Sequence, residues 1–169
     1  MKQPHTARVK VAVNATPLIY FAKAGALSLL TGLFEIITDN NVYREVVEEG
    51  LKRGSHDAAI VMAAIKKGEI KIVETPHLQE LPFRLGPGEL SVIQLVRNGL
   101  ADMVLIDDSY ARKVCRKMGL KAHGTLYVLK RAVTTGLISR EEAIRMLNKM
   151  VKAGYWLSPQ LLAYFYENV

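Results

Sequence analysis

Acidic and amide side chains that could bind a metal ion occur at four separate places in the chain. Asn14 follows one apolar run, and Asp107 and Asp108 follow another. Glu45 and Glu89 lie near the starts of stretches with helical periodicity. Carboxylate and amide oxygens suit Mg²⁺ or Mn²⁺, and such an ion activates water for phosphodiester hydrolysis. If the fold brings these residues together, the sequence predicts a metal site.

The candidate residues fall where predicted strands end or predicted helices begin. Apolar runs predict strands at 9–13, 34–38, 70–73, 103–106 and 120–123. Helices are predicted at 17–30, with a break or kink at Gly25, and at 42–51, 55–67, 88–98, 109–118, 125–134, 139–152 and 158–168. Thr16 is expected to cap the first helix, with Pro17 as its first residue. The alternation indicates an α/β class, a three-layer α/β/α sandwich with a mostly parallel sheet, which binds ligands at the carboxyl ends of its strands.

The length and composition of the chain limit the number of domains and the kinds of partner that we expect. We expect one domain over residues 1–169, with the C-terminal helices of 139–169 packed on it. The net charge of +7 favours a polyanion such as RNA or DNA over a membrane surface. The chain shows no signal-peptide pattern and no run of the ~20 apolar residues that span a bilayer, which indicates a cytoplasmic protein. Cys115 is the only cysteine, which excludes an intramolecular disulfide, and we expect a packed, inert thiol.

Each candidate residue also has a purely structural explanation. Asp108 is suited to capping the helix that starts at residue 109, and Glu89 favours the positive end of its own helix. Glu45 belongs to an acidic run, which on a helix is usually a solvated face. Asn14 suits a turn at the end of a strand. The pattern alone leaves both explanations open.

Motifs spread over most of the chain resemble a known family. They are 14–19 (NATPLI), 42–46 (VYREV), 86–89 (GPGE), 91–95 (SVIQL), 105–108 (LIDD) with 111–112 (AR), 124–126 (GTL) and 154–158 (GYWLS). In this order and spacing they resemble PIN-domain proteins, and among them a VapC-like subgroup of small prokaryotic nucleic-acid-binding proteins. The resemblance implies a Rossmann-like α/β/α domain that binds Mg²⁺ or Mn²⁺ and cleaves RNA. Many such proteins are the toxin of a toxin–antitoxin pair, so the implied partners are RNA and an antitoxin protein, and relatives that dimerise imply a homodimer.

The resemblance also implies roles for individual residues. The implied catalytic residues are Glu45, Glu89, Asp107 and Asp108, and the implied metal ligands are Asn14, Glu89, Asp107 and Asp108. Thr16 and Thr125 are supporting residues, and the Thr16 hydroxyl would hold a site carboxylate or a metal-bound water. The sequence leaves open which of the two adjacent aspartates binds the metal.

The chain departs from the family's pattern at Asn14, where the pattern has Asp. An amide oxygen can bind a metal ion but brings no charge. The departure supports an alternative function, that of a catalytically impaired PIN fold that binds RNA or a protein partner.

Overall fold

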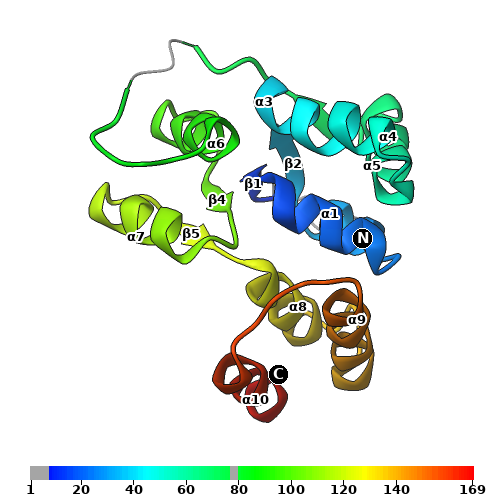
Figure 1. The fold of residues 1–169 in the computed structure, drawn as a ribbon. Coiled ribbons are helices and arrows are strands. Elements are labelled where there is room, and N and C mark those ends of the chain that lie inside the picture. Colours follow the sequence, from blue (N-terminus) through cyan, green and yellow to red (C-terminus); the bar gives the residue numbers. More distant parts are fainter. Residues whose placement is uncertain (1–7, 77–79) are drawn as a thin grey trace, which may run out of the picture.

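The computed structural model describes residues 8–76 and 80–169, which form a parallel β-sheet with helices on both faces (Figure 1). The strands are β1 (Lys10–Val13), β2 (Glu35–Thr38), β3 (Ile70–Ile72), β4 (Met103–Leu105) and β5 (Ala122–His123). Their order in the sheet is β3-β2-β1-β4-β5, and every neighbouring pair is parallel. The predicted α/β/α sandwich is therefore confirmed. Strand β1 is central, and Val11 pairs with both Ile36 of β2 and Met103 of β4.

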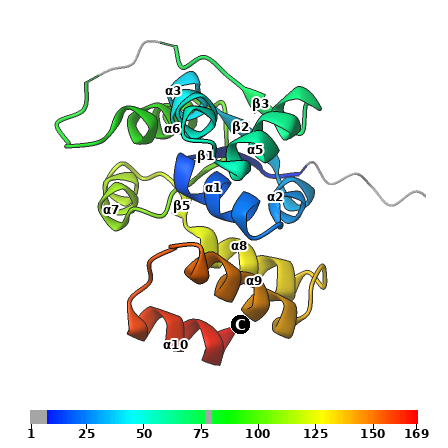
Figure 2. The same ribbon diagram turned by 45° about the vertical axis from the view of Figure 1, so that its right-hand side comes forward.

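The helices begin and end close to their predicted bounds. They are α1 (Ala15–Lys23), α2 (Leu27–Leu33), α3 (Asn40–Tyr43), the π-helical turn η1 (Arg44–Glu48), α4 (Glu49–Lys52), α5 (His56–Lys66), α6 (Pro87–Arg97), α7 (Ser109–Lys117), α8 (Thr125–Thr134), α9 (Arg140–Lys152) and α10 (Pro159–Asn168). Helices α6 and α7 lie on one side of the sheet and α1 and α5 on the other, as Figures 1 and 2 show. Part of the predicted loop, residues 77–79, lies outside the described residues.

The first helix differs from its prediction at its start. It begins at Ala15 with Asn14 as its N-cap, so the expected Thr16 cap is wrong. Pro17 is tolerated in the first turn, where backbone N–H groups have no partner within the helix. The predicted break at Gly25 is confirmed, because this residue has a φ of 68°, a left-handed conformation that separates α1 from α2.

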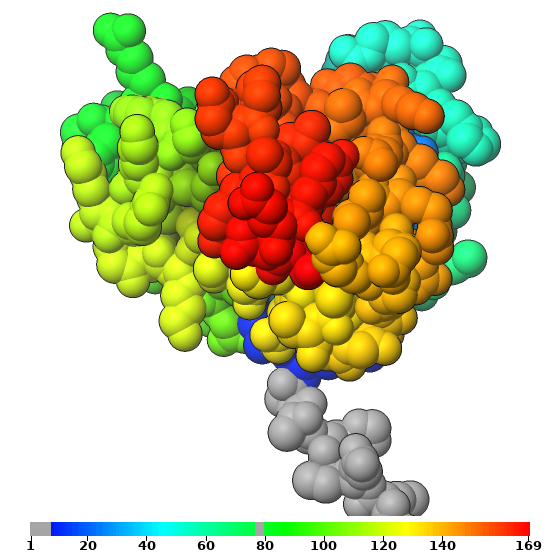
Figure 3. Space-filling model, turned by 90° about the horizontal axis from the view of Figure 1, so that it is seen from below, coloured from blue at the N-terminus to red at the C-terminus, as the bar shows by residue number. Residues whose placement is uncertain are grey.

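The C-terminal helices share the main hydrophobic core. Leu147 and Met150 of α9 and Phe165 of α10 are buried in it. The Arg140 side chain donates hydrogen bonds to the carbonyls of Tyr166 and Val169, which ties the end of α10 to the start of α9. Helices α8, α9 and α10 gather on one face of the molecule (Figure 3).

Two further predictions concern the core and the membrane. Cys115 is fully buried, and burial raises the pKa of its thiol to about 11, which makes the side chain inert at neutral pH. Among the residues that the structure describes, no helix has both the length and the apolar character needed to cross a membrane.

Candidate metal centre

Asn14 lies at the carboxyl end of the central strand. Its backbone N–H donates to the Leu105 carbonyl at 2.9 Å, which places Asn14 beside the end of β4. The residue is only 7% exposed, and its side-chain oxygen Oδ1 has no hydrogen-bond partner within the described residues. A buried oxygen without a partner costs on the order of 1–3 kcal/mol, a cost that a bound donor or cation would remove.

Glu45 reaches the same place from the π-helical turn η1. The turn adds a residue to the helix, and the Glu49 N–H accordingly donates to the carbonyl of Arg44, five positions earlier. A Cβ atom added to Gly88 would lie 3.2 Å from Asn14 Oδ1 and 3.3 Å from Glu45 Oε2. The amide oxygen and the carboxylate therefore converge on one small space that only a glycine leaves open.

The charge of Glu45 is unfavourable in this position. Desolvation by burial, followed by the neighbouring negative charge of Glu89, raises the pKa of Glu45, although Arg53 opposes the shift. The residue as a whole is exposed, but its carboxylate is partly desolvated. No ion pair among the described residues includes Glu45, Glu89, Asp107 or Asp108. A bound cation would relieve this repulsion.

Glu89 is held at the start of α6. Its Oε2 accepts a hydrogen bond from the Gly86 N–H at 2.9 Å, which satisfies a free donor at the N-terminus of the helix. The predicted structural role of Glu89 is therefore present. The cap uses one carboxylate oxygen, and Oε1 has no hydrogen bond within the described residues.

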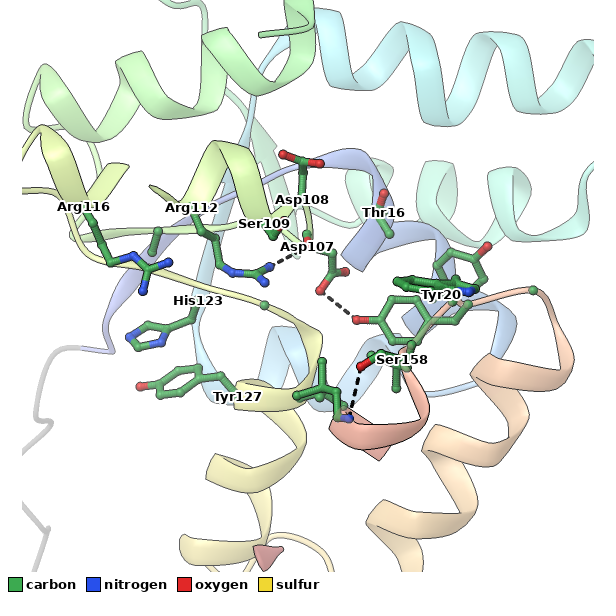
Figure 4. Close-up of a pocket in the computed structure, with 18 residues that line it drawn as sticks. Thr16, Tyr20, Asp107, Asp108, Ser109, Arg112, Arg116, His123, Tyr127 and Ser158 are labelled. Atoms are coloured by element: carbon green, nitrogen blue, oxygen red, sulfur yellow. Dashed lines mark hydrogen bonds between the residues drawn. The ribbon is translucent and has the colours of Figure 1, made fainter. Parts of the chain in front are cut away.

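The two adjacent aspartates have different surroundings. Asp108 is the N-cap of α7, and its Oδ1 accepts from the Ala111 N–H at 2.7 Å. Asp107 accepts from the Thr125 N–H at 2.7 Å, the Thr125 hydroxyl at 2.8 Å and the Tyr155 hydroxyl at 2.9 Å. The two side chains point in different directions in Figure 4. Both carboxylate oxygens of Asp107 are thus used, whereas Oδ2 of the exposed Asp108 has no partner among the described residues.

Gly124 makes the Asp107 arrangement possible. A Cβ atom at this position would lie 2.8 Å from Asp107 Oδ1 and 3.2 Å from an Arg112 guanidinium nitrogen. That nitrogen donates to the carbonyls of Ile106 and Asp107 at 2.9 and 2.6 Å. Glycine therefore lets the start of α8 approach the end of β4 closely.

The fold brings some of the predicted site residues together and separates others. Asn14, Glu45 and Glu89 are neighbours, while Asp108 lies at the same edge of the sheet. The supporting threonines lie on the other side: Thr16 lines a cavity beside the two aspartates, and Thr125 binds Asp107. Within residues 8–76 and 80–169, no three His, Cys, Asp or Glu side chains are close enough together to hold a metal ion.

The donor set nevertheless fits a hard divalent cation. The unpartnered Asn14 oxygen and the partly desolvated Glu45 carboxylate supply neutral and anionic oxygen ligands at one point. Helices α1, α6 and α7 all begin at this edge, and their positive N-terminal ends favour an anionic substrate. Mg²⁺ and Mn²⁺ both accept such ligands.

Sequence reasoning missed three contributors to this region. Gly88 and Tyr155 were noted only as parts of motifs, because their contacts depend on segments that are distant in sequence. Arg112 was also missed, since a basic residue on a helix usually faces solvent. The glycine beside Glu89 was the available signal, because glycine inside a helix often marks a close approach.

A parallel α/β/α sheet that gathers oxygen ligands at its carboxyl edge is a plan suited to metal-assisted hydrolysis of phosphodiesters. The chain belongs to the PIN-domain family, because the family model described as PIN domain matches residues 10–169. PIN domains are generally nucleases, typically dependent on a divalent metal, so the match supports a nuclease-type enzyme with a nucleic-acid substrate. No curated protein matches the chain. The VapC-like subgroup stays a prediction.

Proposed function

We propose that this protein is a divalent-metal-dependent endoribonuclease. The observation that carries the proposal is the convergence of Asn14 Oδ1, buried and without a partner, with Glu45 Oε2 beside Gly88. Asn14, Glu45, Glu89 and Asp108 would hold Mg²⁺ or Mn²⁺. When bound, such an ion activates water and stabilises the negative charge that develops on the phosphate.

The chain's own residues position the site and favour the substrate. The helix caps made by Glu89 and Asp108 fix both carboxylates while leaving one oxygen of each free. The net charge of +7 draws a polyanion to the protein. Asp107 is assigned a positioning role, because its hydrogen bonds join the end of β4 to α8 and to Tyr155.

The test is cleavage of a single-stranded RNA of mixed sequence in the presence of Mn²⁺, Mg²⁺ or a chelator. We expect cleavage that requires the metal and that Glu45→Gln abolishes. Glu48→Gln is the matched control, because Glu48 is an exposed acid on the same π-helical turn. Cleavage that survives both the chelator and Glu45→Gln would contradict the proposal.

A second candidate function is a PIN fold that binds RNA or a protein without efficient catalysis. It is favoured by the neutral Asn14 and by the hydrogen bonds that occupy both oxygens of Asp107, since both reduce the negative charge available to a cation. This function predicts RNA or protein binding without metal-dependent cleavage in the assay above.

We also propose a toxin role with an antitoxin partner, and a homodimer. Leu161 and Tyr164, at 40% and 58% exposure, present apolar surface on α10 that suits a second copy. Light scattering should give the dimer mass, and a monomer at micromolar concentration would contradict the dimer.

Expression of the wild-type protein should arrest bacterial growth, whereas expression of the Glu45→Gln variant should not. Equal growth of the two expression strains would contradict the toxin role.

A further inference from the structure

A cavity of about 690 Å³ lies next to the metal centre and shares Asp108 with it. It is lined by α7, β5, α8 and the segment 154–161, which crosses from α9 into α10 (Figure 4). Thr16 and Asp108 line it, whereas Asn14, Glu45 and Glu89 do not. Its volume is in the range of small-molecule sites, and it opens beside the place where the scissile phosphate would lie.

One wall of the cavity carries a free cation. Arg112 and Arg116 lie one turn apart on α7, so both point to the same side. The Arg112 guanidinium donates hydrogen bonds to the carbonyls of Ile106 and Asp107. Arg116 is exposed, and its side chain has no hydrogen bond or ion pair with any described residue, which leaves the guanidinium available for a phosphate.

The same side of the cavity has a flat aromatic surface. His123 and Tyr127 stack with ring centroids 3.8 Å apart and an angle of 13° between the planes, and Figure 4 shows them below Arg116. Burial, with the nearby charges of Arg112 and Lys121, lowers the pKa of His123 and keeps the ring neutral at neutral pH. The pair therefore offers aromatic surface rather than positive charge.

Trp156 contributes a second aromatic ring from the 154–161 segment. It is 81% exposed, the most exposed of the large hydrophobic residues described, although it lines the cavity. The neighbouring Tyr155 is fixed by its hydrogen bond to Asp107 and by a tilted contact with Tyr20, at 5.1 Å between ring centroids. The cavity wall carries Arg112 and Arg116 as well as Asp107 and Asp108, and the exposed indole is available to stack on a planar ligand.

We propose that this cavity binds one unpaired nucleotide of the RNA strand, with its base stacked on Trp156 and its phosphate on Arg116. Sites that bind single-stranded nucleic acids combine positively charged side chains with exposed aromatic rings. The aromatic rings stack on the bases, each of which has a π-face, and the positive charges bind the phosphates between nucleotides. The inference rests on the proposed ribonuclease function, and it adds a subsite that selects single-stranded RNA adjacent to the cleaved bond.

The only tryptophan in the chain supplies the test. We expect oligouridylate, added with a chelator to prevent cleavage, to quench the fluorescence of Trp156 in a saturable manner. Arg116→Ala should weaken binding about tenfold, the loss expected for one charge-assisted contact. Arg97→Ala, an exposed arginine at the far end of α6, should leave the affinity unchanged.

A second measurement tests stacking without using tryptophan as the probe. By anisotropy of a labelled oligouridylate, Trp156→Ala should bind roughly five- to hundredfold more weakly, as expected for the loss of one base–aromatic stack. Trp156→Phe should restore most of the affinity. An equal loss in the alanine and phenylalanine variants would overturn the stacking role.

Other outcomes separate this inference from the proposed function. Metal-dependent cleavage without quenching would overturn the subsite and leave the ribonuclease intact. Quenching without cleavage would support the subsite and contradict the ribonuclease. Equal affinity for free uridine monophosphate and the oligonucleotide would show a mononucleotide site, and equal competition by hexaglutamate would show a general anion site; either result overturns the proposal of a strand subsite.

Discussion

Asn14 Oδ1 and Glu45 Oε2 lie 3.2 and 3.3 Å from the position that a Cβ atom on residue 88 would occupy. Asn14 extends from the end of the central strand and Glu45 from a π-helical turn, so two unrelated segments deliver oxygen atoms to one point. The third segment, at the start of α6, contributes the space through Gly88 and a further carboxylate through Glu89. Addition of one methyl group at this position therefore tests the site without changing any ligand.

Gly88→Ala should weaken Mn²⁺ binding and cleavage while the protein stays folded. The added methyl group would press on Asn14, Glu45 and the side chain of Val42, which lies 3.3 Å from the same position. Replacing glycine in a helix stabilises it by up to about 1 kcal/mol, which offsets part of the crowding. Calorimetric Mn²⁺ titration and thermal melting measure the two effects separately.

Gly32→Ala is the matched control for that variant. Gly32 lies within α2, and a Cβ atom there would meet nothing within 4 Å. This change should raise the melting temperature and leave Mn²⁺ affinity as in the wild type. Unchanged Mn²⁺ binding in Gly88→Ala would show that the space beside Gly88 is not part of a metal site.

Glu45→Gln should stabilise the metal-free protein at neutral pH. Because the folded-state pKa of Glu45 is raised above its ordinary value of 4.5, the folded protein binds more protons, and stability falls as pH rises from that value through the folded pKa. The gain in the free energy of unfolding should be less than about 1 kcal/mol, since solvent screens the exposed part of the residue. It should disappear well below pH 4.5, where the carboxyl is protonated in both states.

Denaturant melts at several pH values measure this difference, with Glu48→Gln for comparison. A Glu45→Gln protein that is less stable than the wild type at neutral pH in a chelator would show that Glu45 makes a favourable structural contact. That result would contradict the unfavourable charge inferred for the site.

The two adjacent aspartates should respond oppositely to loss of charge. Asp107→Asn removes an acceptor from the Thr125 and Tyr155 donors, so it should destabilise the fold by about 1–3 kcal/mol and leave Mn²⁺ affinity largely intact. Asp108→Asn keeps an oxygen that can cap α7, so it should weaken Mn²⁺ binding with little loss of stability. Melting curves and Mn²⁺ titrations of both variants measure these effects. A loss of Mn²⁺ affinity in Asp107→Asn together with a loss of stability in Asp108→Asn would contradict this assignment.

The sequence predicted the strands and the edge at which the site lies, because apolar runs end at Asn14 and at Asp107. It could not predict the π-helical turn that brings Glu45 to Gly88, since that turn has no periodic signature. Nor could it separate Asp107 from Asp108. Their difference depends on Tyr155, which is remote in sequence and reaches Asp107 only after the C-terminal helices have folded against the sheet.

Binding of single-stranded RNA should weaken steeply with salt, because each phosphate contact releases a counterion. The slope of log affinity against log salt concentration should become shallower by about 0.7 in Arg116→Ala, the value for one lost contact to a single strand. Filter binding between low and physiological salt measures both slopes. A slope near zero in the wild type would contradict a polyanionic substrate.

Calorimetric titration of Mn²⁺ into the wild type and into Asn14→Asp tests the metal centre most directly. A carboxylate at position 14 would add one charge beside the cation, worth on the order of 4 kcal/mol at an effective dielectric constant near 20. Repulsion from Glu45, Glu89 and Asp108 should reduce this gain, leaving roughly ten- to hundredfold tighter binding. We therefore predict a Mn²⁺ site in the wild type that Asn14→Asp tightens; absence of Mn²⁺ binding in both proteins would contradict the metal centre.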